Sequence, residues 1–328
     1  MIDISPYNWL ENIFNKINFE NLPHGLVING PKGIGKTLLS YKISSNLLLN
    51  KSTKIFDKEL FFSKTHPDFF ILNKEKVLLR HITFRKNTKK DEWDEELGER
   101  NINDFLSGTP SISINKVALI LNAHTMNKEA QNALLKTLEE PSPNSFIIIV
   151  TDRSNALFDT IYSRCQTINV APLSNTDLNS WLSAQGITDY SAHDFPSYFT
   201  PLSILNAIEN DQQNDFKNFI DILSNFFVNK IDQNLVIKNL NNLNLDLLTK
   251  LNYLIEFLKI LLKSKLLSET LSGNYSNIKN AQFNNLKISN LINDINNFRI
   301  EYYKVPQINE GHLLNYVFSE LKNSIKIS

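Results

Sequence analysis

The feature that most constrains the fold of this chain is the segment 30–37, whose sequence GPKGIGKT matches the pattern G-x-x-x-x-G-K-T. It follows a short apolar run at 26–28 and precedes a stretch at 38–49 with apolar residues at helical spacing. A strand, this loop and a helix, in that order, bring backbone N–H groups together around phosphate oxygens. The segment therefore predicts a nucleotide-binding site whose contacts come from Gly30, Gly33, Gly35, Lys36 and Thr37.

Two side chains of this segment have expected roles. Lys36 is expected to reach the β- and γ-phosphates, and the Thr37 hydroxyl is expected to ligate magnesium at the start of the helix. ATP or ADP with Mg²⁺ is therefore the predicted cofactor. The alternative interpretation is a relic loop that stays empty or holds ADP passively.

The strand expected at 117–121 carries the second constraint. Strands alternate with helices in this half of the chain, which predicts a parallel sheet with this strand beside the phosphate-binding loop. In an ATP-hydrolysing protein of this type the strand ends in an aspartate that anchors magnesium and a glutamate that polarises water. Here it ends in Leu121 and Asn122, so we expect hydrolysis by this chain to be absent or very weak. The alternative is that Asp152, close to the end of a neighbouring strand, serves instead.

Two further polar residues have open interpretations. Thr151 ends the strand at 146–151, where its hydroxyl could touch a γ-phosphate, but threonine is also a common strand-end residue. His66 could act as a base or a ligand, but a histidine before a proline is more often a turn residue.

A longer pattern surrounds these positions. The segment 132–141 reads NALLKTLEEP, and Ser163-Arg164-Cys165 follows the next predicted strand. Together with HPD at 66–68, NAH at 122–124 and AQN at 130–132, these motifs resemble the AAA+ proteins of the bacterial DNA polymerase III sliding-clamp loader. The resemblance is strong from about residue 21 to residue 170 and rests on architecture alone beyond it.

The resemblance implies a function. Within this family the missing strand-end acids point to the δ′ type, a rigid stator that does not hydrolyse ATP, rather than to the γ/τ motor. By position Arg164 matches the arginine finger that such a stator supplies in trans to the ATP site of a neighbouring motor subunit. The alternative is an ordinary arginine at a helix end that forms a surface ion pair. The implied partners are γ/τ and δ subunits in a hetero-oligomeric ring and, indirectly, the sliding clamp and primer-template DNA.

Two features that are common in this family are missing from the sequence. Many δ′ proteins carry a four-cysteine zinc module after the first helix, but the corresponding segment 51–64 contains no cysteine, so no zinc is expected. The lid domain of AAA+ proteins often supplies an arginine to the nucleotide, and the matching segment 198–203 contains none.

The rest of the chain is predicted to be helical. Leucines at 247, 251, 254, 258 and 261 form an apolar stripe, and Leu314, Val317 and Leu321 form another. We therefore expect an α/β AAA+ P-loop domain at 1–171, a parallel sheet with flanking helices. A small helical lid domain is expected at 172–210, and an all-α collar domain for oligomerisation at 211–328.

The composition argues against several classes of protein. The formal net charge is zero, so no overall field draws the chain to DNA or to membranes. The single cysteine, Cys165, excludes a disulfide framework. Neither a signal peptide nor an apolar run near the ~20 residues of a membrane span is present, so we expect a cytoplasmic protein.

Three functions thus stay open: the δ′-like stator of the DNA polymerase III holoenzyme, a hydrolysing AAA+ motor of the clamp-loader or DNA-helicase type, and a small-molecule P-loop kinase. The helical second half and the Ser-Arg-Cys motif give the kinase no support.

Overall fold

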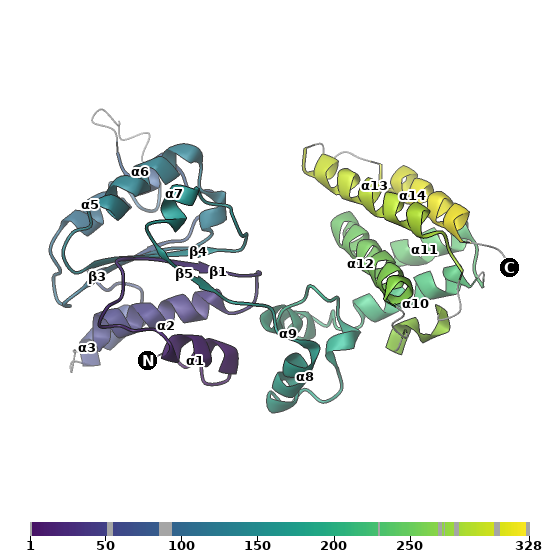
Figure 1. The fold of residues 1–328 in the computed structure, drawn as a ribbon, viewed down its shortest axis with the longest axis horizontal. Coiled ribbons are helices and arrows are strands. Elements are labelled where there is room, and N and C mark those ends of the chain that lie inside the picture. Colours follow the sequence, from purple (N-terminus) through teal and green to yellow (C-terminus); the bar gives the residue numbers. More distant parts are fainter. Residues whose placement is uncertain are drawn as a thin grey trace. The chain divides into compact units, whose positions relative to one another are not determined.

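A computed structural model describes residues 2–50, 55–84, 94–228, 230–267, 271, 273–278, 282–304 and 309–325. The chain divides into two compact units (Figure 1). The first consists of Met1–Ser174 and Thr200–Ser203, and the second of Asn175–Phe199 and Ile204–Ser328.

The first unit is built on a five-stranded sheet in the order β2-β3-β4-β1-β5, and every neighbouring pair of strands is parallel. The register pairs Asn29 with both Thr151 and Asn169, so the carboxyl ends of β1, β4 and β5 are level. The predicted parallel sheet is therefore confirmed. The strands are β1 (Gly25–Asn29), β2 (Phe69–Leu72), β3 (Lys116–Ile120), β4 (Ser145–Thr151) and β5 (Gln166–Asn169).

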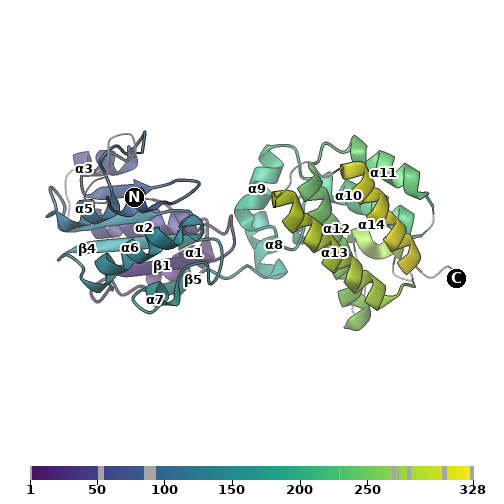
Figure 2. The same cartoon turned by 90° about the horizontal axis from the view of Figure 1, so that it is seen from above.

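Helices cover both faces of the sheet, as Figures 1 and 2 show. Successive strand residues point to opposite faces, so Leu26 and Ile28 join the core on one side and Val27 joins the core on the other. One face is covered by α1 (Asn8–Asn15), α2 (Lys36–Leu49) and α3 (Ile55–Phe62). The other is covered by α4 (Leu79–Ile82), α5 (Ile102–Ser107), the short η2 (Ala123–Thr125), α6 (Lys128–Glu139) and α7 (Asp159–Tyr162).

The helix α6 carries most of the NALLKTLEEP motif. The Asn127 side chain accepts a hydrogen bond from the backbone N–H of Ala130, which caps the first turn. Leu134 and Leu138 are buried against the sheet. The helix ends at Glu139, two residues before Pro141, as expected from the restriction that proline places on the residue before it.

The second unit consists of helices. Its elements are α8 (Asn175–Ala184), η3 (Ala192–Asp194), the greater part of α9 (Pro201–Glu209), α10 (Asp215–Phe227), α11 (Gln233–Asn242), α12 (Leu247–Leu266), η4 (Gly273–Ile278), α13 (Asn285–Lys304) and α14 (Glu310–Ser324). Both predicted apolar stripes are buried, the first on α12 and the second on α14, where they join one hydrophobic core.

The fold class predicted from the sequence is confirmed: a parallel sheet with flanking helices, followed by a helical region. The boundaries at 171/172 and 210/211 stay predictions, because the two compact units do not separate a lid from a collar. Within the described ranges, every helix is too short or too polar to cross a membrane.

Candidate nucleotide-binding site

The phosphate-binding loop lies between β1 and α2, as the motif predicts. Gly33 and Gly35 adopt left-handed backbone angles, with φ of +78° and +99°. A side chain at Gly35 would also meet Leu10, since an added Cβ would lie 2.6 Å from its Cδ1. The glycines at these two positions therefore satisfy both a backbone and a packing requirement.

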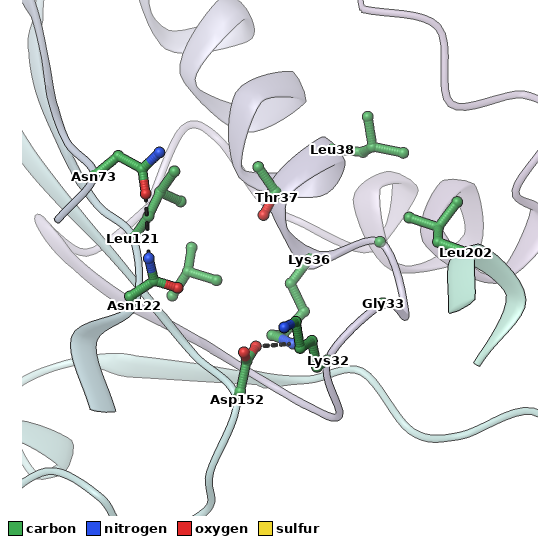
Figure 3. A pocket seen from close by; sticks show the side chains of 12 residues that line it. Lys32, Gly33, Lys36, Thr37, Leu38, Asn73, Leu121, Asn122, Asp152 and Leu202 are labelled. Atoms are coloured by element: carbon green, nitrogen blue, oxygen red, sulfur yellow. Dashed lines mark hydrogen bonds and ion pairs between the residues drawn. The ribbon is translucent and has the colours of Figure 1, made fainter. Parts of the chain in front are cut away.

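A cavity of about 340 Å³ opens beside this loop (Figure 3). Its walls come from the loop, from the start of α2, from the ends of β2, β3 and β4, and from the start of α9. The lining residues are Lys32, Gly33, Gly35, Lys36, Thr37, Leu38, Asn73, Leu121, Asn122, Val150, Asp152 and Leu202. Of the predicted contact residues, Gly33, Gly35, Lys36 and Thr37 thus line the cavity, whereas Gly30 and Thr151 lie outside this lining.

Lys36 is held by two oxygen atoms of its own chain. Its Nζ lies 2.7 Å from Oδ1 of Asp152 and donates a second hydrogen bond of 2.7 Å to the carbonyl of Pro31. The lysine side chain is 3% exposed. Burial lowers the pKa of Lys36, and the hydrogen bond and charge of Asp152 oppose this shift.

An apolar residue, Leu121, and an amide, Asn122, stand where the metal-binding acids would be. Asn122 follows β3 with φ of +54°, a conformation that asparagine tolerates better than most residues. Its Nδ2 donates to Oδ1 of Asn73 at 3.2 Å, while Leu121 is a buried apolar neighbour. Across the described part of the chain, no three His, Cys, Asp or Glu residues group to hold a metal ion. The segment 51–54, which belongs to the stretch considered for zinc, lies outside the described residues.

Thr151 and His66 are used locally. The buried Thr151 hydroxyl donates to the carbonyl of Arg153 at 3.0 Å. His66 is 2% exposed, and its Nδ1 accepts from the backbone N–H of Asp68 at 3.1 Å. The remaining proton of the neutral ring is therefore on Nε2, which donates to the Ser113 hydroxyl at 3.3 Å. In this arrangement His66 cannot accept a proton from Ser113, which argues against a role as a base. The contacts support the interpretation of His66 as a turn residue.

The start of α9 contacts the phosphate-binding loop through Thr200 and Leu202, two residues of the segment 198–203 that the family resemblance relates to the nucleotide. The Thr200 hydroxyl donates to the carbonyl of Lys32 at 2.8 Å, and the backbone N–H of Leu202 donates to the carbonyl of Gly33 at 3.1 Å. These bonds join the loop to a segment far away in the chain. Both bonds end on backbone carbonyl groups of the loop. They come from the segment 198–203, in which AAA+ proteins often carry an arginine and this chain has none.

Arg164 lies on the surface, after α7, and does not line the cavity. Its guanidinium forms an ion pair of 2.6 Å with Glu139 at the end of α6, and its Nη1 donates to the carbonyl of Thr160 at 2.9 Å. The side chain is 34% exposed. Both contacts are made at the protein surface, where a competing anion can reach the guanidinium.

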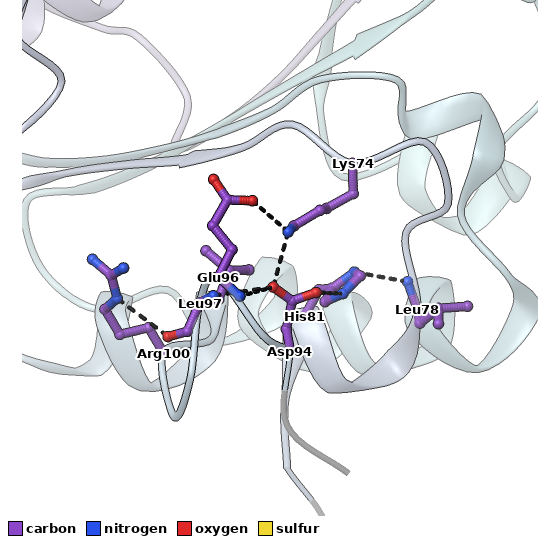
Figure 4. Close-up of polar contacts among 7 residues, drawn as sticks. All are labelled: Lys74, Leu78, His81, Asp94, Glu96, Leu97 and Arg100. Atoms are coloured by element: carbon purple, nitrogen blue, oxygen red, sulfur yellow. Dashed lines mark hydrogen bonds and ion pairs between the residues drawn. The ribbon is translucent and has the colours of Figure 1, made fainter. Parts of the chain in front are cut away.

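A polar cluster after β2 was also not foreseen (Figure 4). Lys74 pairs with Asp94 at 2.8 Å and with Glu96 at 2.6 Å, and Nε2 of His81 lies 3.2 Å from the second Asp94 oxygen. Burial opposes the charge of Asp94, but hydrogen bonds from Lys74 and from two backbone N–H groups outweigh it and lower the pKa of Asp94. Lys74 directly follows Asn73, a residue of the cavity wall, so its ion pair with Asp94 holds the residues around Asp94 close to that wall.

The fold and the cavity define an α/β P-loop protein in which β3, separated from β1 by β4, is followed by an apolar residue and an amide instead of two acids. Residues 7–174 match the family described as "DNA polymerase III, delta subunit", and the chain belongs to this family. The kinship with DNA polymerase III subunits expected from the sequence motifs is thereby confirmed.

Individual relatives agree with the family match. The DNA polymerase III subunit delta' of Pseudomonas aeruginosa is 30% identical over 172 residues, which cover 50% of this chain and 48% of the relative. The protein of the same name from Escherichia coli is 30% identical over 190 residues, covering 55% and 53%. The chain thus spans about half the length of these curated relatives. Among solved structures, a DNA polymerase III gamma subunit-related protein from Thermotoga maritima is 14% identical, with 96% and 99% coverage and a TM-score of 0.48.

Proposed function

We propose that this chain is a δ′-type stator of the DNA polymerase III clamp loader. In this role it supplies Arg164 in trans to the ATP site of a neighbouring γ/τ motor subunit, within a cytoplasmic ring that also contains δ. The ring loads the sliding clamp onto primed DNA. The family and the names of the curated relatives support the kind of complex.

One observation carries the proposal: Arg164 is a surface residue outside the cavity of its own chain. A planar, permanently charged guanidinium can bind phosphate oxygens through two parallel hydrogen bonds. Its present partner, Glu139, is 48% exposed, so the pair is screened by solvent and holds the arginine weakly. A phosphate group of an adjacent subunit can therefore replace the carboxylate.

The chain's own cavity supports nucleotide binding without turnover. Backbone N–H groups of the loop, Lys36 and Thr37 suit the phosphates of ATP or ADP. Magnesium would be held by Thr37 and the phosphates, because Leu121 and Asn122 offer no carboxylate. Nucleotide bound in this way would stabilise the first unit against unfolding and would not drive a reaction.

The helical half completes the proposal. We assign residues 172–210 to a lid and residues 211–328 to a collar through which ring subunits associate. The hydrogen bonds from Thr200 and Leu202 to the phosphate-binding loop are compatible with a lid that reports on the state of the loop.

The test is Arg164→Ala in a loader reconstituted from this chain with its own motor, δ and clamp partners. Single-turnover hydrolysis at the motor site beside this chain is expected to fall by about 10³-fold, the lower end of the range for fingers supplied in trans. Arg164→Lys is expected to recover only part of the rate, because lysine offers a point charge in place of a fork.

The matched control is Arg100→Ala. Arg100 is also an exposed arginine whose guanidinium donates to a carbonyl three residues earlier, that of Leu97. Its removal should leave the rate unchanged. Full activity of the Arg164→Ala complex would refute the finger. Robust ATP turnover by the isolated chain, abolished by Lys36→Ala, would favour the motor ATPase instead.

A further inference from the structure

Asp152 lines the cavity and forms an ion pair with the lysine that is expected to bind a nucleotide phosphate. Its Oδ1 lies 2.7 Å from Nζ of Lys36, the atom that binds phosphate in a loop of this kind (Figure 3). The third group in this arrangement, the Pro31 carbonyl, accepts a second hydrogen bond from the same nitrogen at 2.7 Å. Two of the three N–H groups of the lysine are thus already used by the protein.

The fold places the carboxylate there. The register of β1 and β4 pairs Asn29 with Thr151, so the next residues along the two strands, Gly30 and Asp152, leave the sheet side by side. The chain then turns at Asp152, because the Thr151 hydroxyl donates to the carbonyl of Arg153 and accepts from its backbone N–H. The strand register and the local turn therefore bring the Asp152 carboxylate to Lys36.

The consequence for a ligand is electrostatic. A phosphate that binds Lys36 competes with the carboxylate for the same ammonium group and lies close to it, because Lys36 and Asp152 line one cavity. Like charges at such distances repel strongly where water is partly excluded. Asp152 is 26% exposed, so it can turn towards solvent, but its charge stays near the phosphates.

We propose that Asp152 is an internal competitor of the nucleotide phosphates that keeps the affinity of this phosphate-binding loop low. This inference rests on the proposed binding of nucleotide at the loop and specifies how that binding is regulated. The chain then holds Lys36 in a paired state without a ligand, and the loop keeps its conformation whether or not nucleotide is present.

The experiment compares the full chain with Asp152→Asn, which keeps the shape of the side chain and removes its charge. Affinities for ADP, ATP and AMP are measured by calorimetric titration, once with Mg²⁺ and once with EDTA. Asp152→Asn should bind ADP and ATP at least about tenfold more tightly in both buffers. AMP should gain less, because it lacks the β-phosphate that the lysine contacts.

Two controls and a second test variant complete the experiment. Glu20→Gln removes an exposed acid outside the cavity lining and should change no affinity. Lys36→Ala should abolish ADP binding in the wild-type and Asp152→Asn backgrounds alike. Asp152→Ser is the second variant if the asparagine variant folds poorly, and the same gain is expected from it.

Each other outcome overturns the inference. Equal affinities of wild type and Asp152→Asn would exclude competition while leaving nucleotide binding intact. Weaker binding of the variant in Mg²⁺ alone would assign Asp152 to the metal. If neither wild type nor variant binds nucleotide at millimolar concentration, the competition and the nucleotide site both fail, while the Arg164 experiment still decides the stator role.

Discussion

At the scale of single residues, Asn122 explains how the site can lose its acids without losing its structure. The residue occupies a left-handed turn after β3, where an asparagine costs little. Its amide donates to Asn73, so the polar groups at the two strand ends satisfy each other.

Asp94 gives a residue-scale prediction about pH. Its pKa is lower in the folded chain than the value of about 3.9 for an unfolded aspartate, so its stabilisation is present above about pH 4 and is lost as the pH falls further. Asp94→Asn should therefore lower the free energy of unfolding by about 1 kcal/mol at pH 7, and the difference should shrink below about pH 4. Urea denaturation at several pH values measures this, and faster amide exchange at Leu97, which donates to Asp94, should accompany it.

Glu96→Gln is the matched control, because Glu96 contacts the same lysine but is 77% exposed. It should change the free energy of unfolding by less than about 0.5 kcal/mol. A pH-independent loss in Asp94→Asn would mean that packing, and not charge, explains the role of Asp94.

At the scale of elements, the phosphate-binding loop and the start of α9 fit together closely at Gly33. An added Cβ would overlap the Thr200 hydroxyl oxygen and lie 2.6 Å from the Ser203 hydroxyl oxygen, and the φ of +78° disfavours any side chain. A side chain at this position would therefore strain the backbone and force the two hydroxyl groups to move.

Gly33→Ala should lower the free energy of unfolding of the first unit by roughly 2–4 kcal/mol, the sum of backbone strain and overlap. It should also weaken ADP binding, because the loop must move away from α9. Gly98→Ala isolates the backbone contribution, since Gly98 has φ of +60° and open space around the added atom. Its expected cost is about 1–2 kcal/mol. Equal losses in the two variants would contradict a close fit to α9.

At the scale of the whole molecule, the two units have separate hydrophobic cores. Two clusters, one on each face of the sheet, are made only of residues from the first unit, and a third is made only of residues from the second. Separate cores allow separate unfolding, so one free energy does not describe the chain.

Scanning calorimetry should therefore resolve two transitions. Phe219→Ala removes a fully buried ring of the helical core that packs edge-on against Tyr253, at a cost of about 3–5 kcal/mol, and should lower the midpoint of one transition only. Leu134→Ala, in the core between α6 and the sheet, should lower the other. A single transition that shifts in both variants would show that the units unfold as one.

The sequence by itself determined the features that depend on residues close together in the chain. The phosphate-binding loop, the Leu121-Asn122 strand end and the leucine stripes are all set by spacing within a few residues. Periodicity and turn chemistry are local, and they were enough to predict the parallel sheet and the helical half.

Only the tertiary structure decided which distant groups meet. Strand register brought Asp152 to Lys36, the course of the chain after β5 brought Thr200 to the phosphate-binding loop, and the packing of α6 beside α7 gave Arg164 its partner Glu139. Such contacts join segments that no periodicity relates, because their geometry depends on how whole elements pack against the sheet.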